Sequence, residues 1–344
     1  MNPLIWTVLI TGLSTGSIIT MMSHHWLLAW LGLELNTLSI LPIIIKPHHP
    51  RATEATTKYF LVQATAAMLI LFASTLNAWQ TGQWSIMATT PVITTTLALA
   101  LLLKLGVAPA PFWYPDVLQG STMRTALLIS TWQKLAPLSL LYMIISNAPT
   151  QVLFVGLLST LIGGWAGLNQ TQLRKIMAFS SIAHMGWLIT ATTINPSLAS
   201  ITLSMYIIMT SSVFHYMDNT TAKTISDLST AQVYYPAITT TMMVTLMSLG
   251  GLPPMTGFMP KWLILKELTL MNMPFLCTML ALSSLPSLFF YIRMTYLISL
   301  TTAPSTNTMK HKWRFKNNPH TYMTLTTVLS LLLLPITPLM YNSL

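Results

Sequence analysis

Long apolar runs follow one another along almost the whole chain, and this feature constrains the fold most. A transmembrane helix needs about 20 apolar residues, and the sequence holds eleven runs of about that length or longer. They lie at residues 2–22, 24–45, 57–79, 86–112, 122–146, 149–168, 173–194, 197–217, 235–271, 274–300 and 321–341. Only 6% of the 344 residues are charged. The sequence therefore predicts an all-α, polytopic transmembrane helix bundle of about eleven spans.

Glycine and proline interrupt two of these runs, the fourth and the ninth. The residues that interrupt them are Pro109 and Pro111 in GVAPAP, and Gly250, Gly251, Pro253 and Pro254 in GGLPP. Because glycine permits irregular backbone and proline lacks a hydrogen-bond donor, we expect two broken helices, with breaks at 105–111 and 250–254.

The spacing of the broken runs predicts an internal repeat. Five crossings separate them, and an odd number places two copies in opposite orientations, as in the inverted repeats of many transporters. We predict a single membrane-embedded domain over 1–344, with five-helix repeats at about 1–146 and 149–300. The last span, at about 321–341, is then an addition to the repeats.

Basic residues of the loops and of the neighbouring span ends fall on one side of the predicted bundle. That side receives Lys46, Arg51, Lys58, Arg124, Arg174, Lys175, Lys223, Arg293, Lys310, Lys312, Arg314 and Lys316, whereas loops of the other side carry none. The positive-inside rule then fixes the orientation and accounts for the net charge of +10. For the basic segment 310–320 we expect contact with anionic lipid and no nucleic acid.

Six ionisable residues remain inside the predicted spans. They are Glu34, Lys104, Lys134, Lys261, Lys266 and Glu267. Such groups are costly in a bilayer and indicate a functional site by default. Lys104 lies just before the first break, and Lys134 lies near Pro137, which cannot bond back to the carbonyl of Gln133. We predict a polar proton route through Glu34, Lys104, Lys134 and Lys261.

The first three of these residues also have structural interpretations. Glu34 fits a hydrogen-bonded structural acid, and Lys104 fits a lysine that snorkels to the membrane interface. Lys134 is central in its span and fits a structural ion pair. Lys266 and Glu267 are adjacent and point in different directions on a helix, so capping is as good an interpretation as function.

Lys261 and His184 complete the set of candidate residues. Lys261 follows Pro260, so we expect it in the first turn of the second half-helix, where the helix dipole opposes an ammonium group. Lys104 lies near the end of its half-helix, where the helix dipole favours an ammonium group. The proton affinities of Lys104 and Lys261 should therefore differ. His184 is predicted to begin its span close to a basic loop, either as a candidate relay or as a hydrogen-bonded interfacial histidine.

No cofactor or metal motif occurs in the sequence. A nucleotide-binding glycine fingerprint, a haem motif and an iron–sulfur cysteine run are absent, and Cys277 is the only cysteine. The adjacent pair His48 and His49 lies in a loop, where the side chains do not converge as helix-spaced metal ligands do. We predict that this chain holds no cofactor and no metal, and that it carries out no redox chemistry itself.

Four motifs together resemble a known family. The stretches KLGVAPAPFWYPDV, TWQKLAP, LRKIMAFSSIAHMGW and GGLPPMTGFMPKW are similar to subunit 2 of mitochondrial NADH:ubiquinone oxidoreductase, respiratory complex I. That family belongs to the antiporter-like subunits, which are related to Mrp-type cation/proton antiporters, and the resemblance covers the whole chain. It implies that Glu34 and Lys104 form a Glu/Lys pair, that Lys134 is the central-axis lysine, and that Lys261 belongs to the second broken helix.

The resemblance also implies a function and a location. A core membrane-arm subunit would take part in proton translocation across the mitochondrial inner membrane, coupled to electron transfer from NADH to ubiquinone. The complex would use NADH, FMN, iron–sulfur clusters and ubiquinone in other subunits. Partners would be neighbouring antiporter-like and small membrane-arm subunits and membrane lipids. The N-terminus would lie in the matrix and the C-terminus in the intermembrane space.

One departure from the family and two alternative functions stay open. Pro111 stands about where the family commonly has a histidine, so a relay role for that histidine does not carry over. A stand-alone cation/proton antiporter is the first alternative, and a structural assembly subunit is the second. Co-purification with cofactor-bearing subunits discriminates against the first. The number of protons pumped per electron after substitution of Lys134 distinguishes a proton relay from a structural assembly subunit.

Overall fold

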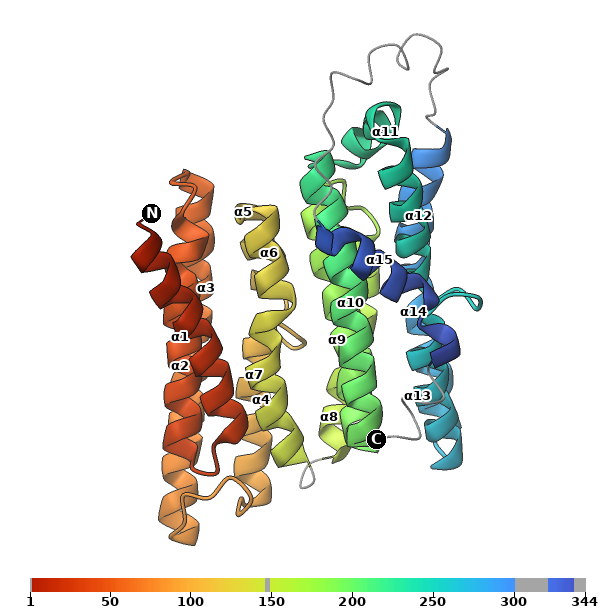
Figure 1. The fold of residues 1–344 in the computed structure, drawn as a ribbon. Coiled ribbons are helices and arrows are strands. Elements are labelled where there is room, and N and C mark those ends of the chain that lie inside the picture. Colours follow the sequence, from red (N-terminus) through yellow and green to blue (C-terminus); the bar gives the residue numbers. More distant parts are fainter. Residues whose placement is uncertain (1, 146–148, 301–320, 337–344) are drawn as a thin grey trace. The chain divides into compact units, whose positions relative to one another are not determined.

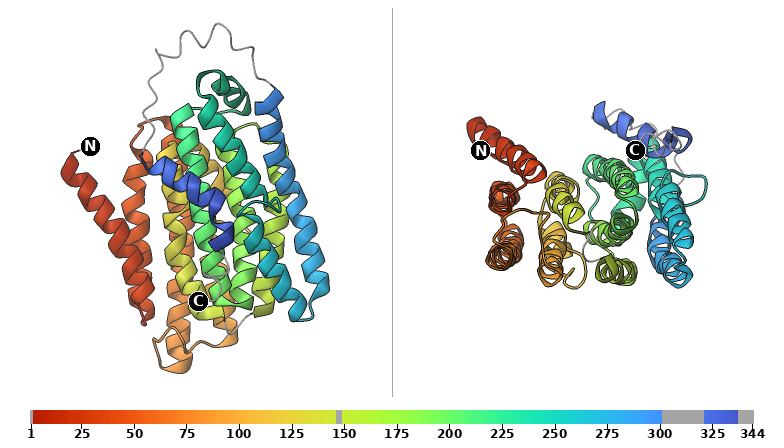
Figure 2. Two further views of the ribbon diagram at one scale, coloured as in Figure 1. Left: turned by 45° about the vertical axis from the view of Figure 1, so that its right-hand side comes forward. Right: turned by 90° about the horizontal axis from the view of Figure 1, so that it is seen from below.

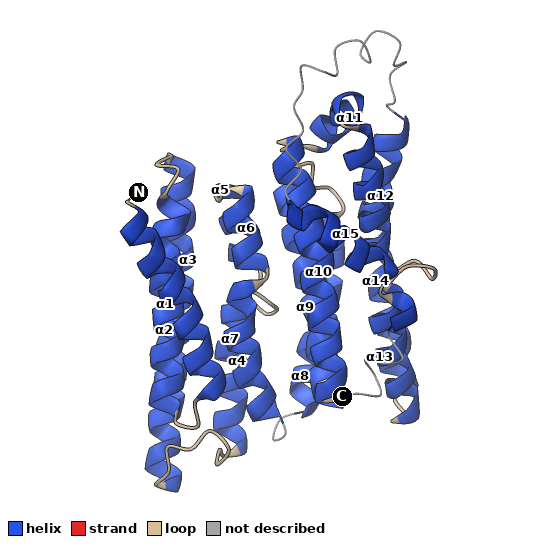
Figure 3. Cartoon of the chain, viewed as in Figure 1, coloured by secondary structure: helices blue, strands red, loops and turns tan. Residues whose placement is uncertain are grey.

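The computed structural model describes residues 2–145, 149–300 and 321–336, and in these ranges it is all-helical apart from connecting loops and two isolated bridges (Figure 3). The α-helices are α1 (Pro3–Met22), α2 (Trp26–Ile45), α3 (Pro50–Thr81), α4 (Pro91–Leu105), α5 (Trp113–Gly120), α6 (Met123–Ser130), α7 (Trp132–Ile144), α8 (Pro149–Gly167), α9 (Leu173–Ile194), α10 (Pro196–Thr220), α11 (Ile225–Tyr234), α12 (Pro236–Gly250), α13 (Phe258–Leu270), α14 (Pro274–Leu300) and α15 (Thr321–Leu332). The basic segment 310–320 and the end of the last predicted span lie outside the described residues.

The apolar helices confirm a multi-pass membrane protein. Within the described part of the chain, six helical segments are long and apolar enough to cross a membrane: α1, α2, α3, the pair α6 and α7, α10 and α14. Four shorter apolar segments lie in α4, α8, α12 and α15. The count of eleven spans stays a prediction.

The chain divides into two compact units, residues 1–159 and 160–344 (Figures 1 and 2). The first unit contains α1 to α7 and the start of α8, and the second contains the rest of α8 and the helices that follow. The right-hand view of Figure 2, seen from below, shows most helices of each unit nearly end-on. The predicted single domain with inverted repeats stays a prediction.

Small residues bring α1 and α2 into backbone contact in the first unit. A Cβ added to Gly16 would lie 2.9 Å from the Gly32 carbonyl oxygen, and one added to Gly32 would lie 2.9 Å from the Gly16 carbonyl oxygen. Membrane helices commonly approach closely at small residues, because dispersion contacts there replace the hydrophobic effect. The glycines therefore fix the crossing point of these two helices.

The loop histidines cap helices. His25 Nδ1 accepts a hydrogen bond of 3.2 Å from the Leu27 amide at the start of α2, and His49 Nδ1 accepts one of 3.2 Å from the Arg51 amide at the start of α3. Each bond satisfies one of the amide groups that a helix start leaves unpaired. Capping is therefore the local role that the structure gives to these two histidines.

Both predicted helix breaks are confirmed. Helix α4 ends at Leu105 and α5 begins at Trp113, while α12 ends at Gly250 and α13 begins at Phe258. The residue after each first half is a glycine with positive φ, +69° at Gly106 and +81° at Gly251, a conformation that side chains with a Cβ rarely adopt.

Three further features differ from the prediction. The run 122–146 is interrupted at Thr131, between α6 and α7, six residues before Pro137. The ring of Pro137 collides with a straight helical path at the carbonyl of Gln133, and the chain departs from helical geometry just before that point. Helices α5 and α11 were not predicted; α11 begins with a capping box formed by Thr224 and Asp227.

Candidate functional site

Lys104 and Lys134 line one enclosed cavity in the first unit. Lys104 comes from the last turn of α4 and Lys134 from the first turn of α7, and their exposed fractions are 6% and 2%. The cavity offers a volume of about 10 Å³ to the centre of a water molecule, which is roughly the room that one buried water needs. Burial excludes the interpretation of Lys104 as a lysine that snorkels to the interface.

Polar side chains from three helices surround these lysines. Gln63 of α3 donates a hydrogen bond of 3.2 Å to the Lys104 carbonyl, which the break leaves without its usual helical partner. Gln133 of α7 donates one of 2.9 Å to Asn36 of α2, and the Tyr59 hydroxyl donates one of 3.4 Å to Gln133. The cavity wall therefore carries hydrogen-bonded polar side chains among its apolar residues.

The two ammonium groups have different surroundings. The Lys134 ammonium lies 5.0 Å from the ring centre of Tyr114, a cation–π contact with a residue of α5. The Lys104 ammonium is buried and has no hydrogen-bond partner among the described residues. A charged ammonium at this position leaves its hydrogen-bonding capacity unused, so the protonation of Lys104 is open to control by nearby charge.

Glu34 supplies the nearest such charge on α2. It is half-buried, and the Thr37 hydroxyl donates a hydrogen bond of 3.3 Å to its Oε2 atom. Glu34 interacts electrostatically with Lys104 but does not contact it within the 4.0 Å of an ion pair. Thr37 also lines the cavity. The Glu/Lys pair implied by the resemblance is therefore a pair at a distance, with a threonine between the carboxylate and the cavity.

Lys261 lies across the second break. It is in the first turn of α13, as predicted, yet its ammonium donates a hydrogen bond of 2.9 Å to the carbonyl of Gly250 at the end of α12. A carboxyl-terminal helix end favours a positive charge, so α12 offsets the opposing dipole of α13. The expected difference in proton affinity between Lys104 and Lys261 stays a prediction, and the dipole argument for it must include the end of α12.

His184 is not close to a basic loop, and that prediction is corrected. It lies in the middle of α9, eleven residues after Leu173, where the helix starts. Its Nε2 atom is 3.4 Å from the Tyr291 hydroxyl of α14, and its ring centre is 5.8 Å from that of Tyr206 of α10. The charge of the preceding loop indicates where the helix begins but not how deep His184 lies within it.

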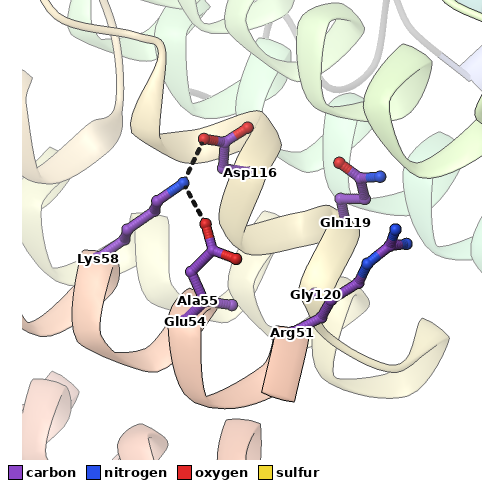
Figure 4. A pocket seen from close by; sticks show the side chains of 7 residues that line it. All are labelled: Arg51, Glu54, Ala55, Lys58, Asp116, Gln119 and Gly120. Carbon is purple, nitrogen blue, oxygen red and sulfur yellow. Dashed lines mark hydrogen bonds and ion pairs between the residues drawn. The ribbon is translucent and has the colours of Figure 1, made fainter. Parts of the chain in front are cut away.

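A group of charged residues lies where the start of α3 meets α5 in the first unit (Figure 4). Lys58 forms ion pairs of 2.8 Å with Glu54 and 2.9 Å with Asp116, around a cavity of about 170 Å³. All three side chains are more than a third exposed, so the pairs add little stability. They do connect α3 to α5, which carries Tyr114 into the lysine cavity.

Sequence reasoning missed most of the residues that complete the cavity. Tyr59, Gln63, Tyr114 and Gln133 line it with the lysines. The signal was available, because polar side chains inside apolar runs need partners that lipid cannot supply. Of the remaining candidates, Lys266 is exposed and Glu267 half-buried, and neither lines this cavity.

Comparison with known proteins gives consistent results over the whole chain. A family model described as NADH:quinone oxidoreductase/Mrp antiporter, transmembrane, matches residues 23–287, and one described as NADH dehydrogenase subunit 2 C-terminus matches residues 288–341. NADH-ubiquinone oxidoreductase chain 2 of Oncorhynchus mykiss is 51% identical over 341 residues, which is 98% of each chain. That of Xenopus laevis is 49% identical over 342 residues, 98% of this chain and 99% of the relative.

Solved structures share the fold. A chain of respiratory complex I from Thermus thermophilus has a TM-score of 0.85 at 24% identity, covering 97% of this chain and 78% of that one. A chain of the Mrp complex from Dietzia sp. has a TM-score of 0.82 at 14% identity, covering 99% and 76%. Together with the sequence matches, these findings show that the chain belongs to the NADH-ubiquinone oxidoreductase chain 2 family, within the NADH:quinone oxidoreductase/Mrp antiporter membrane proteins.

Proposed function

We propose that this chain moves protons through the membrane arm of respiratory complex I by way of Lys104, Lys134 and Lys261, with Glu34 setting the charge near Lys104. The observation that carries the proposal is the single cavity lined by both Lys104 and Lys134. Two buried ammonium groups in one cavity repel each other, so protonation of one opposes protonation of the other. Such coupling suits a proton relay better than a structural role.

The polar wall of the cavity gives the relay a physical basis. Asn36 and Tyr59 each form a hydrogen bond to Gln133, and the cavity has room for about one water molecule. Hydroxyl and amide groups that bond to a water let it accept a proton from one lysine and donate one to the other. Electron transfer from NADH to ubiquinone in other subunits then supplies the energy, and this chain holds no cofactor.

The proposal is tested by proton movement per NADH oxidised. Native complex with one of the three lysines replaced by methionine is reconstituted into sealed vesicles, and acidification is measured with a pH-sensitive dye. A lower ratio at normal abundance supports the relay. If all three substitutions leave the ratio of protons to NADH normal and lower only the amount of assembled complex, the lysines have a role in assembly alone.

A stand-alone antiporter would resemble the Mrp complex, whose chain shares the fold at 14% identity. This chain is 51% and 49% identical to two chain 2 proteins over 98% of its length, and this similarity favours a complex I subunit. Purification of the native complex from mitochondria should recover this chain with subunits that carry flavin and iron–sulfur clusters. Recovery without any of them would favour the antiporter.

The orientation proposed is the N-terminus in the matrix and the C-terminus in the intermembrane space of the mitochondrial inner membrane. In the second unit, the Leu173 amide donates a hydrogen bond to the Lys223 carbonyl. The Arg293 guanidinium donates one to the Leu168 carbonyl. Three basic regions of the chain therefore meet at one end of that unit. This clustering supports the positive-inside assignment and contact with anionic lipid at that face.

Protease protection checks the orientation. In mitoplasts, whose outer membrane is ruptured, we expect protease to spare the segment 301–320 and to cut it only after the inner membrane is opened with detergent. Cleavage of this segment in intact mitoplasts would reverse the assignment. A tag added after Leu344 is the matched control, because it should be cut in mitoplasts without detergent.

A further inference from the structure

Tyr291 connects the two candidate proton sites of the second unit. Its side chain, on α14, is 1% exposed, and its hydroxyl lies 3.4 Å from His184 Nε2. Its ring packs on the last residue of α12, since a Cβ added to Gly250 would lie 3.7 Å from Tyr291 Cδ2. The Gly250 carbonyl is the acceptor for the Lys261 ammonium at 2.9 Å. One side chain therefore contacts the histidine and lies beside the residue that holds the lysine.

We propose that Tyr291 is a positioning residue for proton transfer in the second unit: its hydroxyl fixes the orientation of the His184 ring, and its ring borders Gly250, whose carbonyl binds Lys261, and limits how far that residue can move. This inference rests on the proposed function of Lys261 and on the candidate role of His184 as a proton relay. It adds a residue on α14, a helix to which neither the sequence motifs nor the lysine cavity assign a role.

The backbone around Tyr291 is held firmly enough for such a role. Arg293 lies two residues after Tyr291 on α14, and its guanidinium donates a hydrogen bond of 2.7 Å to the Leu168 carbonyl. On the other side, Phe290 packs against Gly167, where an added Cβ would lie 2.9 Å from the phenylalanine ring. Phe290 and Arg293 are both held against the end of α8. The backbone of α14 therefore sets the position of Tyr291.

A hydroxyl suits the contact with His184 for a chemical reason. Neutral imidazole presents either a donor or an acceptor at Nε2, and protonated imidazole presents a donor. A tyrosine hydroxyl can donate or accept, so it keeps a hydrogen bond to His184 when the ring gains or loses a proton. Ser180 provides the hydroxyl with a second partner, and the Tyr206 ring lies beside the imidazole. The ring therefore keeps one orientation through both protonation states.

The test is Tyr291→Phe in the assembled complex, reconstituted into vesicles. Phenylalanine keeps the ring that packs on Gly250 and removes only the hydroxyl, so abundance should stay near that of the unsubstituted complex. The rate of proton pumping per assembled complex should fall roughly two- to tenfold, the factor that one hydrogen bond commonly contributes. Tyr296→Phe is the matched control: it removes the same hydroxyl from a tyrosine of α14 that is 58% exposed, and pumping should not change.

A double substitution separates positioning from general weakening. If the hydroxyl acts through the histidine, Tyr291→Phe combined with His184→Leu should pump no more slowly than His184→Leu alone. Additive losses would overturn the proposal, as would unchanged pumping in Tyr291→Phe, or a loss that follows abundance with the rate per complex unchanged.

Lys261→Met distinguishes this inference from the proposed function. If Lys261→Met lowers pumping while Tyr291→Phe does not, the role of Tyr291 is wrong and the proposed function stands. If Lys261→Met and His184→Leu both pump like the unsubstituted complex, the proposed function itself fails in the second unit, and the inference about Tyr291 fails with it.

Discussion

Replacement of Lys134 by methionine should nearly abolish proton translocation while the complex still assembles. Methionine approximates the length and the apolar stem of lysine, so the packing of α7 against its neighbours should largely survive. The change removes the titratable group and the cation–π contact with Tyr114. It also removes a charge whose burial at the membrane centre costs about 2.5 to 3.5 kcal/mol on insertion scales, so stability should not fall. Proton pumping and NADH oxidation per assembled complex in vesicles are the measurements.

Two further substitutions make this result interpretable. Glu34→Gln should cause a weaker defect, because it changes the charge near Lys104 and leaves every lysine of the relay in place. Lys266→Met is the matched control, since Lys266 is an exposed lysine on a predicted span and lies outside the cavity. It should pump normally. If Lys134→Met keeps the normal ratio of protons to electrons and normal turnover, Lys134 is not part of the pathway and its role is structural.

The sequence predicted the breaks and the buried lysines because both have a local signature. A lysine in an apolar run and a glycine–proline cluster are visible without knowledge of the fold. Proline alone is a poorer guide: Pro42 and Pro286 lie inside α2 and α14, which stay continuous, whereas the chain near Pro137 is interrupted at Thr131. The difference depends on tertiary packing, which a single sequence does not contain.

The cavity itself could not be predicted, because its walls come from helices far apart in the chain. Asn36 and Gln133 are 97 residues apart and form a hydrogen bond of 2.9 Å. The contact of Lys261 with Gly250 adds a second helix end to the dipole argument, since the side chain is long enough to reach the end of the preceding half-helix. Helix α11 had a readable signal in the capping box of Thr224 and Asp227, which a search for apolar runs does not detect.

At the second break, replacement of Gly250 by alanine should leave assembly intact, whereas replacement of Gly257 by alanine should disrupt it. Gly257 lies just before α13, and a Cβ added there would collide with the backbone carbonyl oxygen of Ser248 on α12. A backbone atom cannot rotate away as a flexible side chain can, so one of the two half-helices must move. The adjacent Thr256, fully buried, donates a hydrogen bond to the Ser330 carbonyl of α15, which restricts that movement.

We therefore expect Gly257→Ala to lower the abundance of assembled complex severely. Overpacking commonly costs about 1 to 3 kcal/mol, and a collision with fixed backbone belongs at the upper end of that range or beyond it. Gly250→Ala is the matched control from the same break, because its Cβ would lie 3.7 Å from the nearest atom, an ordinary contact. Native gel electrophoresis of mitochondrial membranes measures both abundances. Normal assembly of Gly257→Ala would mean that the half-helices can separate at the break, and that the position of Lys261 is not fixed by the packing of α12 against α13.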